Sequence, residues 1–391
     1  MPSIRQTFVE RKITDMWGKR SRAVTLLVGL LAFALVFSAC GGSDSDSNGS
    51  DAGSGSKSEA SPDPVKLKVA ISPYQDVNTL FVGIEQGFYE EAGIELEIVK
   101  TGWAAAQELL IGNQVDLANI SDGDVVLQNA QGHDTTLAFP IFLFSAGALM
   151  FDPEKHDWKT YESFAEAAGG DGPEAVKKTL EQIKGKKIGV SAAGNEYATF
   201  VGLVRYAGLN LKDYEIVDID SEDLPPALFS GSIDLAIGGI PQRLAAIREG
   251  YEALIGQTAL PGGVHHGGLG AHRSWLEENP ELASKLQGVI IKTLDYIAQN
   301  PDEAFPAISE VLKESGTEIS TEELKTVWNK IEFFPDSKEY YEEHIFSPEG
   351  KFYWKDRFDL VVGELTKAGK IKELEVPMED LYKAEEIIGS L

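Results

Sequence analysis

The sequence is short of cysteine and of basic residues. Cys40 is the single cysteine among 391 residues, which excludes an intrachain disulfide, a thiol pair and a cysteine-based zinc site. Lysine and arginine number 35 against 62 aspartates and glutamates, so the formal net charge is −27. Because an acidic surface repels the phosphate backbone, this charge predicts no nucleic-acid partner. The same charge also keeps a protein soluble, so it identifies no ligand by itself.

The apolar run near the start of the chain is short for a membrane span. Residues 23–37 (AVTLLVGLLAFALVF) form this run, whereas crossing the hydrocarbon core takes about 20 residues. Six basic side chains precede it within residues 1–22, and Ser38, Ala39 and Cys40 follow it. A basic region, an apolar run and small residues at the break predict a secretory signal peptide over residues 1–39.

The residues at the end of the apolar run carry a second sequence signal. Residues 37–40 (FSAC) resemble the lipobox of bacterial lipoproteins, with Phe37 where leucine is usual. The resemblance implies that Cys40 is acylated and becomes the first residue of the mature protein, tethered to the membrane by lipid. The alternative is that the apolar run stays uncleaved and is itself the anchor. We therefore expect the protein at the cell membrane, on the extracytoplasmic face, at the cell surface or in the periplasm.

The residues after Cys40 predict a flexible linker. Residues 41–64 are glycine, serine and aspartate with almost nothing apolar. As a coil, such a segment spans about 25 to 30 Å, enough to hold a globular body away from a membrane surface. The acylated cysteine and linker thus make up residues 40–64.

The next segment, residues 67–122, reads as strand, helix, strand, helix and strand. Its short apolar runs at 67–71, 94–99 and 115–120 alternate with amphipathic helix-length runs at 76–91 and 103–111, as in a buried parallel sheet. A short helix is expected to follow at 123–131. The phrase GNQVDLA at 112–118 returns as GSIDLA at 231–236, one residue shorter. The chain therefore holds two similar α/β lobes.

The second lobe repeats the same alternation. We expect strands at 187–191, 215–219, 233–237 and 253–255, with helices at 196–207, 224–229 and 241–249. Residues 146–151 and 266–271 are predicted to cross between the lobes and to act as hinges. Helical patterns follow from residue 274 to residue 388, and we assign this tail to packing on the first lobe. The predicted domains are 65–150 plus 268–391 for lobe 1 and 151–267 for lobe 2.

The order of these segments resembles a known family. Residues 87–97 (GFYEEAGIELE), 110–118, 183–190 (IKGKKIGV), 227–236 and 276–281 (LEENPE) look like those of solute-binding proteins that serve ABC importers for nitrate, aliphatic sulfonates, taurine and thiamine precursors. The likeness covers about residues 66–300 and is specific as a combination. It implies an α/β fold of two Rossmann-like lobes in the type II periplasmic-binding-protein architecture, joined by two hinge crossings, with a helical C-terminal tail. It also implies capture of a small solute in the cleft and delivery to ABC permease subunits, by a protein that we expect to be a monomer.

Five loops should line the cleft, because ligands of open α/β sheets bind beyond the carboxyl ends of the strands, near helix N-termini. These loops are residues 72–76, 101–103, 121–124, 191–197 and 238–242. The candidate ligand-binding residues on them are Tyr74, Gln75, Asp76, Trp103, Ser121, Asp122, Ser191, Asn195, Glu196, Tyr197, Gly239 and Gln242. The aromatic rings could stack on a flat or apolar ligand, and the amides could hydrogen-bond it.

Each candidate has a purely structural alternative. Asp76, Asp122 and Asn195 are good helix caps, Trp103 could be core, and Glu196 lies in a first turn where carboxylates are favoured anyway.

The ligand class is open between two kinds. Sulfonate-binding and nitrate-binding relatives generally show hydroxyls or a cation at these turns, whereas this chain offers few basic residues there beyond Arg205, Arg243 and Arg273. The carboxylates of the loops suit a ligand with amine or ring N–H donors, such as a pyrimidine or an amino-sulfonate.

Other functions are weaker readings of the sequence. Adjacent His265 and His266 would point to opposite faces of a strand, so at most one of them could join His272 on a metal, and we predict no metal site and no cofactor. An enzyme on the same fold would lean on cysteine or histidine chemistry, but Cys40 is spent at the N-terminus, and no nucleophile elbow, HExxH or Walker loop is present. A ligand-binding sensor lobe for a signalling partner remains the other alternative.

Overall fold

The computed structural model describes residues 63–391 except 169–171, 192–194, 221–222, 368 and 373. The predicted signal peptide, the acylation site Cys40 and nearly all of the linker lie outside these residues. Within the described ranges, no helix combines the length and the apolar character of a membrane span.

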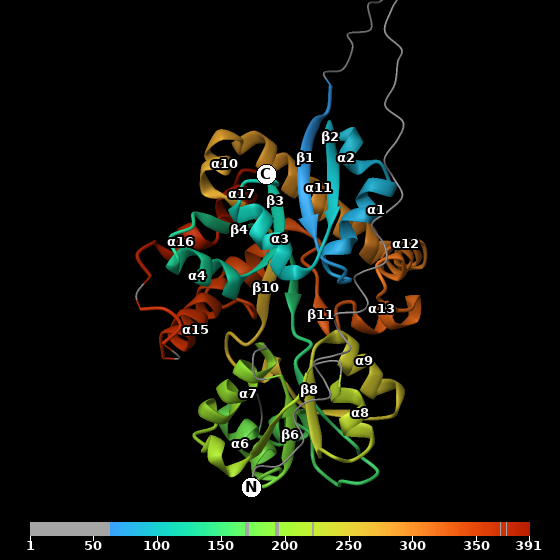
Figure 1. Cartoon of the computed structure of the whole chain (residues 1–391), viewed down its shortest axis with the longest axis vertical. Coiled ribbons are helices and arrows are strands. Elements are labelled where there is room, and N and C mark those ends of the chain that lie inside the picture. The colour runs from blue at the N-terminus through green and yellow to red at the C-terminus, as the bar shows by residue number, and fades with distance from the viewer. Residues whose placement is uncertain (1–62, 169–171, 192–194, 221–222, 368, 373) are drawn as a thin grey trace, which may run out of the picture. The chain divides into compact units, whose positions relative to one another are not determined.

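The first sheet has six strands in the order β11-β4-β10-β3-β1-β2 (Figure 1). Their bounds are β1 Val65–Ile71, β2 Ile94–Lys100, β3 Leu117–Ser121, β4 Thr135–Phe144, β10 His265–His272 and β11 Glu332–Phe333. β1 pairs in parallel with β2 and β3, and β10 runs antiparallel between β3 and β4. β4 is buried at nine of its ten positions, which explains its nearly unbroken apolar sequence.

Short helices connect the parallel strands of this sheet. They are α1 Leu80–Glu85, α2 Phe88–Glu91, α3 Trp103–Ile111 and α4 Asp122–Ala130, preceded by a 3₁₀ turn at Val77–Thr79. The sequence predicted a single helix over 76–91. Gly87 breaks it, because it adopts a φ of 75°, a left-handed conformation that glycine tolerates and that interrupts a helix.

The second sheet has five strands in the order β7-β6-β8-β5-β9. Their bounds are β5 Ala148–Phe151, β6 Lys187–Val190, β7 Glu215–Asp218, β8 Leu235–Gly238 and β9 Glu252–Gly256. Its helices are α5 Tyr161–Ala168, α6 Pro173–Glu181, α7 Asn195–Tyr206, α8 Leu224–Phe229 and α9 Ile240–Arg248. β6 pairs in parallel with β7 and β8, as the repeated α/β pattern predicted.

The C-terminal part is helical, with one short strand, β11. Its helices are α10 Arg273–Glu278, α11 Pro280–Gln299, α12 Pro301–Glu314, α13 Thr321–Val327, α14 Lys338–Tyr340, a π-helical turn Tyr341–Phe346, α15 Trp354–Lys367, α16 Met378–Leu381 and α17 Ala384–Gly389. α11 packs on α1 and α2, and α15 packs on α4, both helices of the first sheet. A buried cluster that includes Trp354, Phe358 and Tyr382 fills the space under this layer.

The two predicted crossings are strands, which corrects the sequence interpretation. Most of 146–151 is β5 in the second sheet, and 266–271 lies in β10 in the middle of the first. A Cβ added at Gly268 would overlap backbone atoms of Phe139 and Ile141 on β4, so this glycine serves close strand pairing rather than bending. The connections between the sheets are residues 145–147 and 257–264. The exact domain bounds stay a prediction.

Gln257 joins these two connections. Its buried side-chain amide donates to the carbonyl oxygen of Phe144 at 2.5 Å and of Gly263 at 3.1 Å. Its side-chain oxygen accepts from the backbone N–H of Gly147 at 2.8 Å. Three backbone groups of the connecting segments are therefore satisfied by one side chain, which holds both segments in register.

Candidate functional site

An aromatic pair stands at the carboxyl ends of β1 and β2. The rings of Tyr74 and Trp103 meet edge to face, with centroids 6.0 Å apart. Tyr74 is 42% exposed, and Trp103 begins α3 with its ring half-buried against the first core. The sequence predicted both rings for ligand stacking, and the structure brings them together.

Ser121 and Asp124, at the start of α4, lie beside this aromatic pair. Ser121 caps α4, and the Asp124 side chain returns to the Ser121 backbone, a reciprocal arrangement that satisfies two helix N–H groups. The same Asp124 carboxylate accepts from the Trp103 indole N–H at 3.1 Å and from the Ser121 hydroxyl at 2.6 Å. Burial raises the pKa of Asp124 despite these hydrogen bonds. The capping box thus also fixes the orientation of Trp103.

Glu196, Gly239 and Gln242 form the facing group, on α7 and α9 of the second sheet. A Cβ at Gly239 would lie 3.6 Å from Oε1 of Glu196 and 3.5 Å from Oε1 of Gln242, so both polar tips converge on this glycine. Burial raises the pKa of Glu196, which favours its neutral form more than in water. These three residues were predicted together, and they lie together.

The charge of Glu196, in the second group, affects the pKa of Tyr74, in the aromatic pair. Burial first, and then the negative charges of Asp76 and Glu196, raise the pKa of the Tyr74 hydroxyl. Asp76 belongs to the first sheet and Glu196 to the second. Segments that follow strands of both sheets therefore lie near Tyr74 and contribute aromatic faces and carboxyl groups.

A cavity of about 140 Å³ adjoins this region on the side of α4 and α7. It shares Ser121, Gly123 and Asp124 with the predicted loops and is otherwise lined by residues that were not predicted to bind a ligand. Those are Leu127, Ala198, Thr199, Gly202, Leu260, Gly263, His265, Arg357, Leu360, Val361, Glu364 and Leu365. The α15 residues among them belong to the C-terminal tail, and their only sequence signal was the amphipathic pattern that we assigned to packing.

Asp122 occupies a different environment from its neighbour Asp124. It is fully buried and accepts from the Arg357 guanidinium through both oxygens, at 2.9 and 3.0 Å, and from the His266 backbone N–H at 2.6 Å. Burial alone would raise its pKa, but Arg357 outweighs that effect and lowers it. Ligand contact by Asp122 stays a prediction; in this structure both of its carboxylate oxygens serve an internal ion pair.

Gln75 and Asp76 are buried beneath Tyr74. The Gln75 side-chain amide donates to Glu332 on β11 at 2.8 Å, and Asp76 accepts from the Val77 N–H at 2.6 Å. Burial raises the pKa of Asp76 to about 7. Asp76 thereby caps the 3₁₀ turn, as the structural alternative had it. No local sequence pattern predicted Glu332 as the partner of Gln75.

The remaining predicted residues lie on the β6–α7 loop. Ser191 follows β6 and is half-buried; Asn195 is the first residue of α7, and its side chain lies outside the description. Tyr197 packs against the core of the second sheet. Their contact with a ligand stays a prediction.

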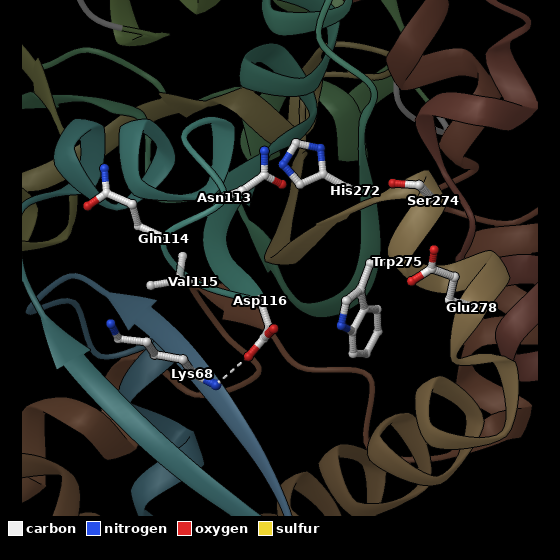
Figure 2. Close-up of a pocket in the computed structure, with 9 residues that line it drawn as sticks. All are labelled: Lys68, Asn113, Gln114, Val115, Asp116, His272, Ser274, Trp275 and Glu278. Atoms are coloured by element: carbon white, nitrogen blue, oxygen red, sulfur yellow. Dashed lines mark hydrogen bonds between the residues drawn. The ribbon is translucent and has the colours of Figure 1, made fainter.

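A larger depression of about 390 Å³ lies elsewhere (Figure 2). Its lining includes Asp116, whose carboxylate accepts from the Lys68 backbone N–H, and Trp275 and Glu278 from α10. Asp116 comes just before β3 begins, so this depression is at the amino ends of the strands. Ligands of such sheets bind at the opposite end, and we do not assign the depression to the site.

The histidines make no metal cluster among the residues that the structure describes. Burial lowers the pKa of His265 to about 3 and that of His266 to about 4, so both are neutral at pH 7. His272 contacts the Asp134 carboxylate through one ring nitrogen. Its second ring nitrogen is 2.8 Å from the Leu110 carbonyl oxygen.

The sequence and the fold are both similar to those of known proteins. The NMT1-like family matches residues 60–312. A protein of Haemophilus influenzae named for thiamine biosynthesis is 28% identical over 164 residues, 42% of this chain and 46% of the relative. The chain thus matches about half the length of this curated relative.

Solved structures with the same fold include a transport protein and an enzyme. A sulfonate-binding protein of a sulfonate ABC transporter from Methylobacillus flagellatus superposes with a TM-score of 0.60 at 15% identity, covering 84% of this chain and 94% of that one. The desulfurization enzyme DSZB gives 0.53 at 12% identity, covering 83% and 98%. At these identities the likeness shows the fold, and the family match covers well over half of the chain. The chain therefore belongs to the NMT1-like family and has the periplasmic-binding-protein fold that its sequence resembled.

Proposed function

We propose that this protein is the extracytoplasmic solute-binding component of an ABC importer, held at the membrane by a lipid on Cys40. One observation carries the proposal: loops that follow strands of both sheets contribute Tyr74 and Glu196 to the same region. A protein of this fold can close on a solute when residues of both lobes contact that same solute. To shift the ratio of closed to open protein from 1:99 to 99:1, the solute must bind the closed form more favourably than the open form by about 5.5 kcal/mol.

The solute should present N–H donors and a flat or apolar body. Acceptors predominate around Tyr74, since Asp76, Asp124 and Glu196 are carboxyl groups whose pKa values burial raises. The rings of Tyr74 and Trp103 and the apolar lining of the adjoining cavity suit a ring system. A pyrimidine with amino groups has both features, and an amino-sulfonate has the donor alone.

A plain sulfonate fits less well, because the basic residues that the sequence offered have other partners. Arg205 pairs with Glu364, Arg243 donates to the carbonyls of Ser145 and Ala146, and Arg273 donates to Asn129 and Thr135. Arg357 lines the cavity, but its charge is matched by Asp122. A sulfonate here would meet buried carboxyl groups, and the guanidinium charges of Arg205 and Arg357 are matched by carboxylates, although Arg243 keeps a buried Nε without a partner among the described residues.

Two measurements test this function. Native mass spectrometry of protein purified from its own host would show the mass of a co-purified solute. Calorimetric titration should then give binding of 4-aminopyrimidine or of taurine that exceeds binding of ethanesulfonate. Tight binding of ethanesulfonate with no response to the amine-bearing compounds would contradict the proposed ligand class.

The enzyme alternative has a specific test because DSZB shares the fold. Incubation with a co-purified solute, followed by mass analysis, should return that solute unchanged. Conversion to a product would favour catalysis over transport.

A further inference from the structure

Two buried oxygen atoms beneath the candidate site have no hydrogen-bond partner among the residues that the structure describes. They are Oε1 of Gln75, in the loop that carries Tyr74, and Oε1 of Glu332 on β11. Gln75 is 4% exposed and Glu332 is completely buried. The other ends of the same two side chains are bonded, because Nε2 of Gln75 donates to Oε2 of Glu332 at 2.8 Å. A buried acceptor without a donor is costly, so two in one contact need an explanation.

A single proton resolves both deficits. If Glu332 is ionised, each orphaned oxygen offers only lone pairs, and no hydrogen bond between them is possible. If Glu332 carries a proton on Oε1, that oxygen becomes a donor and the Gln75 oxygen is its acceptor. The pair then has two antiparallel hydrogen bonds, as an amide and a carboxylic acid form in an apolar medium.

The surrounding charges favour the protonated acid. Burial first, and then the charge of Asp76, raises the pKa of Glu332 well above its usual range, while the Gln75 hydrogen bond acts weakly against this. Arg243 is engaged with the carbonyls of Ser145 and Ala146, and His265, whose ring lies against Phe144, has a pKa lowered by burial.

Among the described residues no basic side chain forms an ion pair with Glu332 or Asp76, although the Lys351 ammonium lies 4.8 Å from the ring centroid of Phe333, the next residue of β11. Lys330 precedes β11 and is exposed, and the charged side chains of α12 are exposed as well. On α13, Glu323 pairs with Arg248, and Lys325 pairs with Asp302 and Glu322.

We propose that Glu332 is a positioning residue of the solute site: as a neutral acid it pairs with the Gln75 amide through two hydrogen bonds and holds the loop of Tyr74 against β11. Its importance for solute binding rests on the proposed function, but the contact itself does not. β11 pairs with the last residues of β4, Leu143 and Phe144, directly before the connection to the second sheet. Glu332 therefore ties the loop that bears Tyr74 to the strand that leads into that connection.

The test is amide hydrogen exchange over residues 72–79, expressed as protection relative to the intrinsic rate at each pH. In the unmodified full chain, protection should fall by about tenfold or more between an acidic and an alkaline pH at which the chain stays folded, as Glu332 loses its proton and the two oxygens repel each other. Glu332→Gln should lose less protection than the unmodified chain between the two pH values, because a second amide makes the same two bonds without titrating and only Asp76, whose pKa is about 7, still gains a charge in this loop. Glu332→Ala should give low protection at both.

The control and a second variant keep the outcome decisive. Glu318→Gln, an exposed carboxylate before α13, should behave like the unmodified chain. Infrared difference spectra should show a protonated carboxyl band that Glu332→Gln lacks, and Asp76→Asn should move its titration to lower pH by removing a neighbouring charge. Protection that does not change with pH in the unmodified chain, or loss of protection in Glu332→Gln equal to that in Glu332→Ala, would overturn the proposal. None of these readouts needs a solute, so a failure of the proposed function would be seen separately in the calorimetry.

Discussion

Asp122 and Asp124 show how differently two residues of one type can behave within a single turn. Asp122 is held ionised by Arg357, which lowers its pKa, whereas burial raises the pKa of Asp124. The first stabilises the packing of α15 on α4, and the second orients the Trp103 ring. The spacing of the two aspartates does not predict this difference, because Arg357, the partner of Asp122, is 235 residues away in the sequence.

Asp122→Asn tests the structural role. The change leaves the buried Arg357 charge without its counterion, so the free energy of unfolding should fall by about 3 to 5 kcal/mol, as for other broken buried pairs. Urea denaturation followed by circular dichroism measures it. As a control, Glu95→Gln removes an exposed pair with Lys66 and should leave the unfolding midpoint in place. A shift in Asp122→Asn no larger than that of the control would contradict the assignment.

Glu196→Ala tests the solute site. The side chain reaches the region between Gly239 and Tyr74, so its loss should weaken solute binding at least about tenfold, the effect of removing one charge-assisted hydrogen bond. Calorimetric titration with the co-purified solute gives the affinity, and the thermal midpoint checks that folding is intact. Glu174→Ala on α6, an exposed carboxylate, is the matched control. Equal affinities in the two variants would move the site to other loops.

At the scale of elements, glycine in β10 and glycine in a helix have opposite functions. The glycine-rich run HHGGLGAH suggested a flexible hinge, but in β10 it is buried at seven of eight positions. Gly268 lets β10 and β4 approach each other more closely than any side chain would permit. Gly363 within α15 has no atom within 4 Å of where a Cβ would stand, so nothing in its surroundings requires glycine.

Gly268→Ala and Gly363→Ala should therefore have opposite signs. The first forces β10 away from β4 and should lower the free energy of unfolding by about 1 to 3 kcal/mol or more. The second should raise it by about 0.5 to 1 kcal/mol, since alanine is the better helix former. Parallel urea titrations compare them. If Gly268→Ala is neutral, the strand pairing at that position is looser than described, and a hinge role for the segment returns.

At the scale of the whole molecule, buried ionisable groups act on stability in opposite directions. His265 and His266 have folded pKa values of about 3 and about 4, below their ordinary value, so the unfolded chain binds protons first as pH falls. Their contribution is complete above about pH 6.5 and is lost on acidification. Asp76 has a raised pKa of about 7, so its contribution is complete below about pH 4 and is lost as pH rises through 7.

His266→Gln separates these contributions. In the unmodified protein, the two histidines should make the free energy of unfolding fall between about pH 6.5 and about pH 4. The glutamine variant should show a shallower fall, because one group that gains a proton on unfolding is gone. Urea titrations at several pH values measure the slope. His133→Gln, at a half-buried position after α4, should keep the original slope, and a slope unchanged in both variants would exclude the histidine explanation.

Cys40→Ser tests the anchor. Without the thiol no acyl chain can be attached, so the protein should leave the membrane fraction and appear soluble outside the cytoplasm. Fractionation and immunoblotting of the native host follow it. If the variant stays membrane-bound and unprocessed, residues 23–37 are the anchor instead.

Much of the fold follows from local sequence patterns. The strands β1, β2, β3, β6, β7 and β8 and the helices α3, α4, α7 and α9 lie close to their predicted ranges, because period, apolar run length and helix-capping residues act over a few positions. The likeness of residues 66–300 to solute-binding proteins is confirmed by the family match. For the site, the rule that ligands bind beyond strand ends selected Tyr74 and Trp103, whose rings meet, and Glu196 and Gln242, whose side chains both lie near Gly239; their contact with a solute stays a prediction.

What the sequence could not determine depends on contacts between distant residues. Glu332 meets Gln75 across 257 positions, and β10 lies between β3 and β4 although all the strands of the second sheet separate it from them in the sequence. Local patterns do not encode which buried carboxylate meets a guanidinium and which meets an amide. The sequence by itself determined the two α/β units, their order and the loops that follow their strands. Tertiary structure alone decided which side chains on those loops are satisfied inside the protein, because burial and pairing set the charge and the free lone pairs of each.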